Sequence, residues 1–235
     1  MPSNNSALAQ RLTQLRSRIA AAEQRFGRAP GSAALLAVSK TQPAEALRAA
    51  FALGQRDFGE NYLQEALQKR QQLGDLAIVW HFIGPIQSNK TKSIAENFDW
   101  VHSVDRLKVA ERLNAQRPEQ LAPLNVCLQV NVSGETTKSG VAPDQVAALA
   151  AGVTALPRLR LRGLMTIPAP AESFEQQRAP LRRLRELLEE LRDRGYALDT
   201  LSMGMSDDLE AAVAEGSTLL RIGTALFGAR PPRTE

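Results

Sequence analysis

The stretch LLAVSKTQPAEAL, residues 35–47, places a polar segment directly after an apolar run. The run LLAVS at 35–39 has the length and composition of a buried strand, and Pro43 suits the first turn of a helix. A strand followed at once by a helix start is a βα unit, the repeat from which parallel sheets are built. Lys40 stands at the junction, which raises the question of whether its amine is a solvated charge or a reactive group.

Further apolar runs follow along the chain, with helical segments between them. Including the first, the predicted strands cover residues 35–39, 56–59, 78–84, 100–104, 125–132, 161–167, 200–204 and 219–223. Strands that alternate with helices in this number predict an α/β protein, a single (β/α)8 TIM barrel. An amphipathic segment within residues 1–30 predicts an extra N-terminal helix that packs on the barrel, and no linker divides residues 1–235 into two domains.

Composition argues against several classes of protein. The chain has 235 residues with a hydrophobic content of 43%, which suffices for the core of one domain. Its one cysteine, Cys127, rules out an internal disulfide, and two histidines without cysteine partners argue against a structural zinc site. No run approaches the roughly 18 apolar residues of a membrane span, and the first residues lack a signal-peptide core. We therefore expect a cytoplasmic protein with no membrane partner.

A net charge of +4 and a pI near 9.6 suggest nucleic-acid binding as one alternative. The basic residues, however, are mixed with glutamate, as in LRRLRELLEELRDRG at 181–195, where leucines form one apolar stripe. No basic block is interleaved with aromatic residues, which make up 5% of the chain. We predict solvated helix faces and no nucleic-acid partner, and a salt-dependent affinity for nucleic acid would contradict this.

The segments after the last two predicted strands carry the polar residues of a candidate site. In TIM barrels the active site lies at the carboxyl ends of the strands, and phosphate is commonly bound by the loops after strands 7 and 8. Ser206 opens the helix predicted after strand 7, with Asp207 and Asp208 in its first turn, and Gly223 and Thr224 follow strand 8. The glycine lets the backbone approach a ligand, and the two hydroxyls add donors. Taken singly, the serine is better explained as a helix cap and the glycine as a tight turn.

Lys40 gains a second interpretation from this topology. As an isolated residue it would be a strand-end lysine whose charge reaches solvent. Strand 1 neighbours strand 8 in a closed barrel, so the amine can converge on a phosphate-bearing ligand held over strands 7 and 8. A lysine amine whose pKa is lowered by desolvation and cationic neighbours attacks aldehydes to form a Schiff base. The implied ligand is an aldehyde that carries a phosphate, a description that pyridoxal 5′-phosphate (PLP) fits.

Longer strings along the chain resemble a known family. They are AVSKTQP, FGENYLQEA, WHFIGPIQSNK, VHSVD, VNVSGETTKSGV, LRGLMTI and LSMGMSDDLEAAVAEGSTLLRIGTALFG, in this order over nearly the whole chain. Together they are similar to the YggS/PROSC family of pyridoxal phosphate homeostasis proteins. The resemblance implies a fold-type III barrel like the N-terminal domain of alanine racemase. It also implies that PLP is held as an internal aldimine, without robust enzymatic turnover.

The resemblance assigns roles to individual positions as well. The lysine of AVSK would form the aldimine, the residues after the last two strands would hold the phosphate, and the arginine of LRIG would face the pyridine nitrogen. The GEN and SMGMS strings would line the pocket. The positions implied for PLP binding are Lys40, Asn61, Met203, Ser206, Arg221, Gly223 and Thr224.

Arg221 has a chemical consequence that does not depend on the resemblance. Carbanion chemistry on PLP is favoured by a protonated ring nitrogen, and a permanently charged guanidinium disfavours that protonation. The electron sink is then weak. The alternative for Arg221 is a surface ion pair, but its place between LL and IG on a barrel strand argues against an open surface.

Three further residues have two interpretations each. His81 and His102 lie in or at the ends of strands, where a general base is one interpretation and a packed histidine the simpler one. Lys138, in the Gly/Ser/Thr loop after strand 5, is either a solvated lysine or a second amine that captures the aldehyde transiently.

We predict a monomeric PLP-binding protein that acts in intracellular PLP homeostasis and delivery, with apo PLP-dependent enzymes as candidate recipients. The first alternative is an amino-acid racemase. Such enzymes take a second base, typically a tyrosine, from another domain, for which this chain is too short, and neither Tyr62 nor Tyr196 is convincingly placed. The second alternative is a cofactor-free Schiff-base aldolase, whose lysine usually lies on a later strand and whose purified protein would be colourless.

Overall fold

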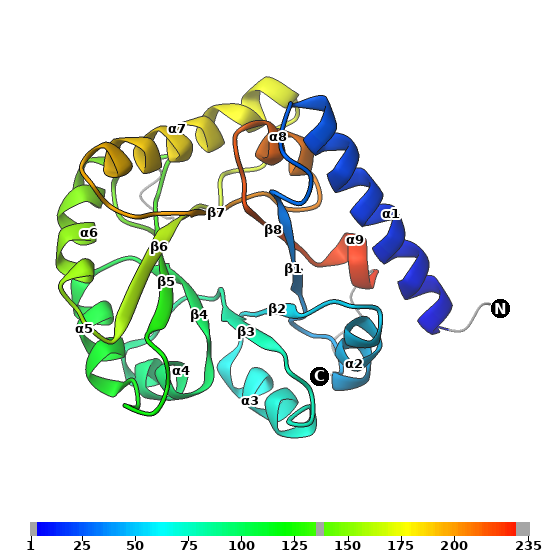
Figure 1. Cartoon of the computed structure of the whole chain (residues 1–235), viewed down its shortest axis with the longest axis horizontal. Coiled ribbons are helices and arrows are strands. Elements are labelled where there is room, and N and C mark those ends of the chain that lie inside the picture. The colour runs from blue at the N-terminus through cyan, green and yellow to red at the C-terminus, as the bar shows by residue number, and fades with distance from the viewer. Residues whose placement is uncertain (1–3, 135–138, 229–235) are drawn as a thin grey trace.

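Eight parallel strands close into a barrel in chain order (Figure 1). The structure is a computed structural model and describes residues 4–134 and 139–228. The strands are β1 (Ala34–Val38), β2 (Asp57–Glu60), β3 (Val79–Phe82), β4 (Trp100–Val104), β5 (Leu124–Gln129), β6 (Leu159–Met165), β7 (Thr200–Ser202) and β8 (Leu219–Ile222). Every predicted strand overlaps an observed one, so the prediction of a TIM barrel is confirmed.

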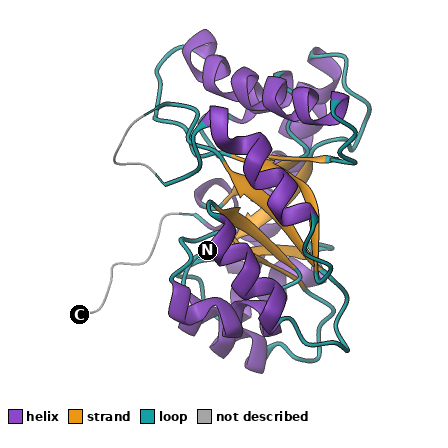
Figure 2. Ribbon diagram, turned by 90° about the vertical axis from the view of Figure 1, so that its left-hand side faces the viewer, coloured by secondary structure: helices purple, strands orange, loops and turns teal. Residues whose placement is uncertain are grey.

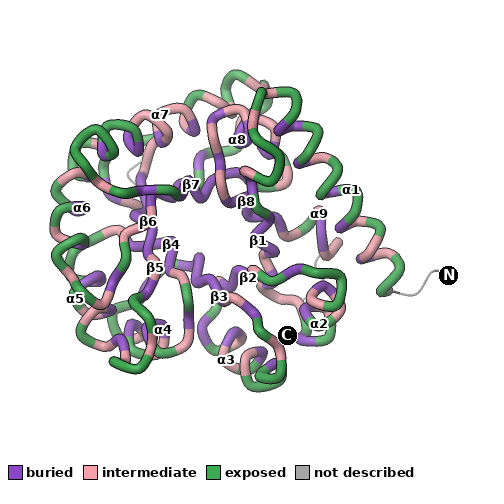
Figure 3. The backbone as a smooth tube through the Cα atoms, viewed as in Figure 1, coloured by how far each residue is buried: buried purple, intermediate pink, exposed green. Residues whose placement is uncertain are grey.

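Helices cover the outside of this barrel (Figure 2). The α-helices are α1 (Asn4–Arg25), α2 (Ala44–Ala52), α3 (Leu63–Gln72), α4 (Thr91–Asn97), α5 (Leu107–Gln116), α6 (Val146–Thr154), α7 (Phe174–Asp193), α8 (Leu209–Ala214) and α9 (Thr224–Phe227). Two 3-10 helices, η1 (Ser88–Lys90) and η2 (Pro143–Gln145), precede α4 and α6. Buried residues lie mainly along the strands and recur on the helices between exposed ones (Figure 3). Strands covered in this way are buried on both faces, which explains their near-continuous apolar runs.

The extra N-terminal helix is present as α1. Its buried residues Leu8, Leu12, Leu15 and Ile19 recur at intervals of three and four, so they share one face of the helix. That face packs against α8 and α9, the helices that follow β7 and β8. Arg11 Nε also donates to Leu226 O over 2.7 Å, which ties α1 to the last helix. The helix therefore covers the part of the barrel at which phosphate binding was predicted.

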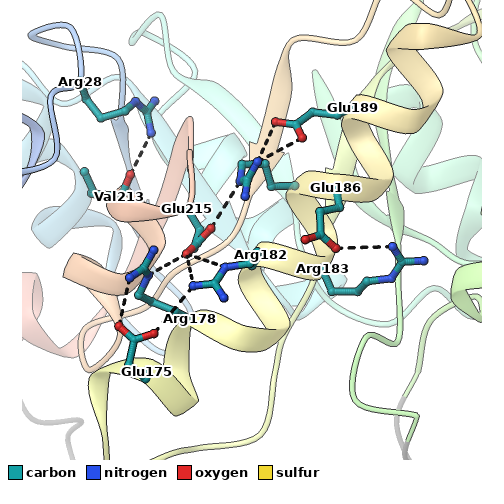
Figure 4. Close-up of polar contacts among 10 residues, drawn as sticks. Arg28, Glu175, Arg178, Arg182, Arg183, Glu186, Glu189, Val213 and Glu215 are labelled. Carbon is teal, nitrogen blue, oxygen red and sulfur yellow. Dashed lines mark hydrogen bonds and ion pairs between the residues drawn. The ribbon is translucent and has the colours of Figure 1, made fainter.

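A buried carboxylate joins α7 to the end of α8 (Figure 4). The Glu215 side chain is 2% exposed and accepts hydrogen bonds from Arg178, Arg182 and Arg185 of α7, the shortest being 2.6 Å from Arg178 Nε. A buried carboxylate is costly unless it is paired, and three guanidinium groups supply the pairing. The sequence predicted that the basic residues of α7 lie on a solvated face. That prediction is wrong for these three arginines, because they gather around one buried carboxylate.

Three observations on the described part of the chain concern its cysteine, metal clusters and long apolar helices. Cys127 is fully buried, and burial raises the pKa of its thiol to about 12, consistent with a packing residue. Across residues 4–134 and 139–228, no cluster of histidine, cysteine and carboxylate side chains has the arrangement of a metal site. No helix in these ranges combines the length and apolar character needed to span a bilayer.

Candidate functional site

A cavity of about 570 Å³ opens at the carboxyl ends of the strands. Six of the seven predicted binding positions line it: Lys40, Asn61, Ser206, Arg221, Gly223 and Thr224. The barrel brings them together because β8 pairs with β1 in parallel, with Leu36 opposite Arg221 and Ala37 opposite Ile222. The segments that follow these two strands are thus neighbours, although they lie far apart in the sequence.

Met203 is the exception, and the expectation that it lines the pocket is wrong. It is fully buried and belongs to the hydrophobic core. Its carbonyl accepts a hydrogen bond from the Ser217 hydroxyl over 2.7 Å. Met205, two residues later, lines the cavity and is 38% exposed. Gly204, with φ of +94°, lies between the two methionines and turns the chain out of the barrel core.

Ser206 lies in the loop and not at the start of the helix, which corrects the predicted cap. The helix α8 begins at Leu209, and its N-cap is Asp208, whose side chain makes no capping hydrogen bond. The Asp208 carboxylate accepts instead from the Met205 N–H over 2.6 Å, which shapes the loop around Ser206. The serine therefore faces the cavity from a loop held by the aspartate.

Donors without a protein acceptor gather on this side of the cavity. In residues 4–134 and 139–228, the N–H groups of Gly223 and Thr224 and the hydroxyls of Ser206 and Thr224 donate to no protein oxygen. All three residues line the cavity. A Cβ at position 223 would lie 3.2 Å from Val38 O, so glycine fits tightly against β1. Four donors of this kind can bind an anion without breaking an existing hydrogen bond.

Arg221 lies between the core and the cavity. Its side chain reaches the cavity although the residue is only 5% exposed. Nη1 donates to the Ser202 hydroxyl over 2.9 Å, and Nη2 donates to Thr166 O over 2.7 Å. Burial lowers the pKa of Arg221 to about 10, which leaves the guanidinium charged at neutral pH. The burial of Arg221 excludes its alternative interpretation as a surface ion pair.

The backbone around Lys40 is strained. Thr41 has a φ of +66° and is the only non-glycine residue with positive φ in the described part of the chain. A β-branched residue seldom adopts this conformation, which costs on the order of 1–3 kcal/mol. The Thr41 N–H donates to Glu65 Oε1 over 2.6 Å, and this hydrogen bond holds the residue in place. Strain is thus stored directly after the lysine that lines the cavity.

A buried ion cluster fixes the residue before Lys40. Lys69 Nζ donates to Ser39 O and to Glu60 Oε1, both over 2.7 Å, and to Glu65 Oε1 over 2.5 Å. The Ser39 hydroxyl donates to Glu60 Oε1 over 2.6 Å. Burial raises the pKa of Glu60, and the neighbouring ammonium of Lys69 opposes that rise. The cluster therefore holds the backbone on both sides of Lys40.

Sequence reasoning missed Arg18, which belongs to α1 and lines the cavity. Its Nε and Nη2 donate to the two carboxylate oxygens of Glu210 over 2.6 Å, and its Nη1 donates to Ser206 O over 3.1 Å. Because α1 lies before the first strand, no strand-end rule could have indicated it. It adds a third cation to a cavity that already holds Lys40 and Arg221, with Asp207 as the opposing charge.

The remaining sequence candidates lie elsewhere. His81 and His102 do not line the cavity and are buried inside the barrel, which confirms the simpler interpretation of packed histidines. Tyr62 is 48% exposed and directly precedes α3. Lys138 lies outside the described residues.

Comparison with known proteins identifies the family. Residues 10–231 match the family model described as alanine racemase, N-terminal domain. A pyridoxal phosphate homeostasis protein of Pseudomonas aeruginosa is 63% identical over 225 residues, which cover 96% of each chain. The protein of the same name from Escherichia coli K12 is 54% identical over 226 residues, covering 95% of this chain and 97% of the relative. The chain belongs to the pyridoxal phosphate homeostasis protein family.

A solved structure that is similar to this chain contains bound PLP. PipY of Synechococcus elongatus PCC7942, solved with PLP bound, superposes on the chain with a TM-score of 0.82 at 40% sequence identity. The match covers 94% of this chain and 100% of PipY. PipY thus shares with this chain both the barrel and nearly its whole length.

Proposed function

We propose that this protein binds PLP in the cavity at the carboxyl ends of the strands and serves PLP homeostasis and delivery inside the cell. The observation that carries the proposal is the joint presence there of Lys40, the buried Arg221 and four donors that have no acceptor among the described residues. These groups match the aldehyde, the ring nitrogen and the phosphate of PLP in number and chemistry. The names of the relatives and the PLP bound to PipY support the same function.

In this proposal, different residues of the cavity bind different parts of PLP. Ser206, Gly223 and Thr224 would bind the phosphate, and Arg221 would donate a hydrogen bond to the ring nitrogen. When bound, PLP would supply an electrophilic aldehyde carbon for the Lys40 amine, and the aldehyde oxygen would leave as water. The cluster around Glu60 would hold the lysine in place for that reaction, while Asn61 would contribute to the wall of the pocket.

A borohydride experiment tests the assignment of Lys40. Protein purified with PLP should be yellow, and reduction followed by peptide mapping should place the adduct on Lys40. Lys40→Ala should abolish the adduct, whereas Lys92→Ala, which removes a lysine outside the cavity, should not. An undiminished adduct in Lys40→Ala would contradict the assignment, and an adduct on Lys138 would transfer the role to that residue. A colourless protein that takes up no PLP would contradict the function itself.

We further propose that the protein carries PLP without turning over amino acids. A charged guanidinium at the ring nitrogen disfavours its protonation and so weakens carbanion stabilisation. The more accessible tyrosine, Tyr62, is absent from the cavity wall, where a racemase would need a second base. NMR measurement of α-proton exchange in deuterated water, with L- and D-amino acids, tests this. Exchange that depends on Lys40 at ~1 per second or faster would favour the racemase.

We also propose that a monomer suffices in the cytoplasm and that apo PLP-dependent enzymes receive the cofactor. The six predicted positions on the cavity wall come together within one chain, so the proposed site needs no residue from a second copy. Light scattering with size-exclusion chromatography tests the oligomeric state. Activation of an apo-enzyme by the loaded protein, compared with an equal amount of free PLP, tests delivery. Slower activation than by free PLP at every protein concentration would contradict direct delivery.

A further inference from the structure

A chain of buried hydrogen bonds crosses the barrel from one end to the other. It runs from Arg221 to Ser202 over 2.9 Å, from Ser202 to His102 Nδ1 over 2.7 Å, and from His102 Nε2 to His81 Nδ1 over 2.9 Å. The last link joins His81 Nε2 to Asp57 Oδ1 over 3.1 Å. We call these five residues the relay. The link between His102 on β4 and Ser202 on β7 spans the interior, because these strands are not neighbours.

The two ends of the relay open to different cavities. Arg221 lines the cavity at the carboxyl ends of the strands. Asp57 begins β2 and lines a second cavity of about 390 Å³ at the amino ends, where its side chain is 37% exposed. The residues between them are no more than 1% exposed: His81, His102 and Ser202. The relay is thus an enclosed connection between the candidate PLP site and the opposite face.

The end at Arg221 fixes the direction of every hydrogen bond. A guanidinium can only donate, so the Ser202 oxygen accepts from it. In the described part of the chain, His102 Nδ1 is the only acceptor within reach of the Ser202 hydroxyl proton. If Nδ1 accepts, the proton of a neutral His102 is on Nε2, which donates to His81 Nδ1. His81 in turn carries its proton on Nε2 and donates it to Asp57.

The other end gives the same result independently. A carboxylate can only accept, so Asp57 takes the Nε2 proton of His81, and the same tautomers follow in reverse order. Burial is the main cause that lowers the pKa of His102 well below its usual value, and the charge of Arg221 acts in the same direction. Every group in the relay is then satisfied with both histidines neutral. A proton added to either histidine would leave the Ser202 hydroxyl without an acceptor.

We propose that Asp57, His81, His102 and Ser202 are positioning residues for Arg221, and that their directed hydrogen bonds orient its guanidinium toward the PLP ring nitrogen. This rests on the proposed function, since the ring nitrogen belongs to PLP. The oriented oxygen of Ser202 and the carbonyl of Thr166 each bind one terminal nitrogen of the guanidinium, so its plane is set by two acceptors. Loss of any hydrogen bond between Ser202 and Asp57 should therefore let the guanidinium plane of Arg221 vary more in orientation.

The first test measures tautomers in the full chain without ligand. The sequence contains two histidines, so long-range proton–nitrogen NMR spectra are simple to assign with a His81→Gln variant. At pH 7.5 both rings should be neutral with the proton on Nε2. A proton on Nδ1 of either ring, or a charged ring, would overturn the relay. This outcome does not depend on PLP binding, so it is distinguishable from failure of the proposed function.

The second test breaks the relay at Asp57, whose side chain is 37% exposed, so its substitution removes no fully buried group. Asp57→Ala should mix the tautomers of both histidines and speed PLP release by about two- to tenfold, the range for one lost hydrogen bond. Asp75→Ala is the matched control, because Asp75 is exposed and outside both cavities. Ser202→Ala should also speed release, and Thr200→Ala on the same strand should not. Unchanged tautomers and release in Asp57→Ala would overturn the proposal.

Discussion

At the scale of residues, the cavity combines cationic side chains with donors that have no acceptor in the described part of the chain. Arg221 is held by two acceptors, Lys40 is flanked by a strained threonine, and Arg18 reaches in from α1. Because hydrogen bonds already restrain the side chains of Arg221 and Arg18, these two have little conformational entropy left to lose when an anion binds. The residues that restrain them matter as much as those that line the cavity.

The phosphate donors give the first prediction. Ser206→Ala with Thr224→Ala should weaken PLP binding, since each hydroxyl contributes on the order of 1.5–3 kcal/mol at most to a charged acceptor. The affinity for pyridoxal, which lacks the phosphate, should hardly change. Both affinities can be measured by titration of the absorption band. Ser88→Ala with Thr154→Ala, both exposed and outside the cavity, is the control. An equal loss for both ligands would contradict a phosphate role.

The buried His102 gives a prediction about pH. Because burial lowers its pKa in the folded state, the unfolded chain binds more protons than the folded chain below the usual histidine pKa of about 6.5. The free energy of unfolding should therefore be unaffected by this residue above pH ~7 and fall as the pH drops below ~6.5. Denaturant unfolding at several pH values measures it. The slope between pH 5 and 6.5 should be smaller in His102→Gln, and an identical slope would contradict the assignment.

At the scale of elements, the barrel strands meet at positions with no room for a side chain. A Cβ at Gly163 on β6 would lie 1.8 Å from Thr200 O on β7. A Cβ at Gly84, after β3, would lie 2.3 Å from Asn61 O, so this glycine allows the segment after β2 to reach the cavity. Close approach of backbones, and not turn geometry, is what these two positions require.

Gly163→Ala gives the third prediction. The methyl group would meet a backbone carbonyl that cannot rotate away, so β6 and β7 must separate. We expect the free energy of unfolding to fall by about 1–3 kcal/mol, which is the typical cost of overpacking a core. Gly195→Ala is a control for the residue type, since nothing lies near its Cβ, although its φ of +91° carries strain of its own. Thermal unfolding measures both variants. A Gly163→Ala variant as stable as the parent would show that the strands can shift without cost.

At the scale of the whole molecule, the cavity depends on both ends of the chain. Its walls come from α1 and from the segments after β1, β2, β3, β6, β7 and β8. Glu215, the end of α8, is bound by three arginines of α7, and α1 packs on α8 and α9. Occupancy of the cavity should therefore stabilise the barrel as a unit and not only one segment.

The fourth prediction is a thermal shift. A ligand present at 100 times its Kd adds about 2.7 kcal/mol to the stability of the folded state. For a chain of this size that corresponds to a rise in Tm of about 5–11 °C. Calorimetry with PLP should show this rise as one transition. Pyridoxal at the same concentration should give a smaller rise. A second transition that PLP does not move would show that part of the chain folds apart from the barrel.

The sequence by itself determined the order and kind of the elements, because strand and helix periodicity and the turn residues are local properties. It also indicated Lys40, Ser206, Gly223 and Thr224, since the TIM barrel places catalytic and binding residues after its strands. The sequence did not predict all the loop residues that line the cavity. Met203 and Met205 differ by two positions, and the conformation of Gly204 decides which of them enters the cavity.

Tertiary structure alone decided the contacts between distant segments. Arg18 reaches the cavity because α1 packs across α8 and α9, and no local pattern encodes that packing. His102 and Ser202 are 100 residues apart, and only barrel closure brings their side chains within hydrogen-bonding distance. Side-chain orientation inside a closed barrel depends on all eight strands at once. For this reason the sequence could identify two packed histidines but not the directed relay to which they belong.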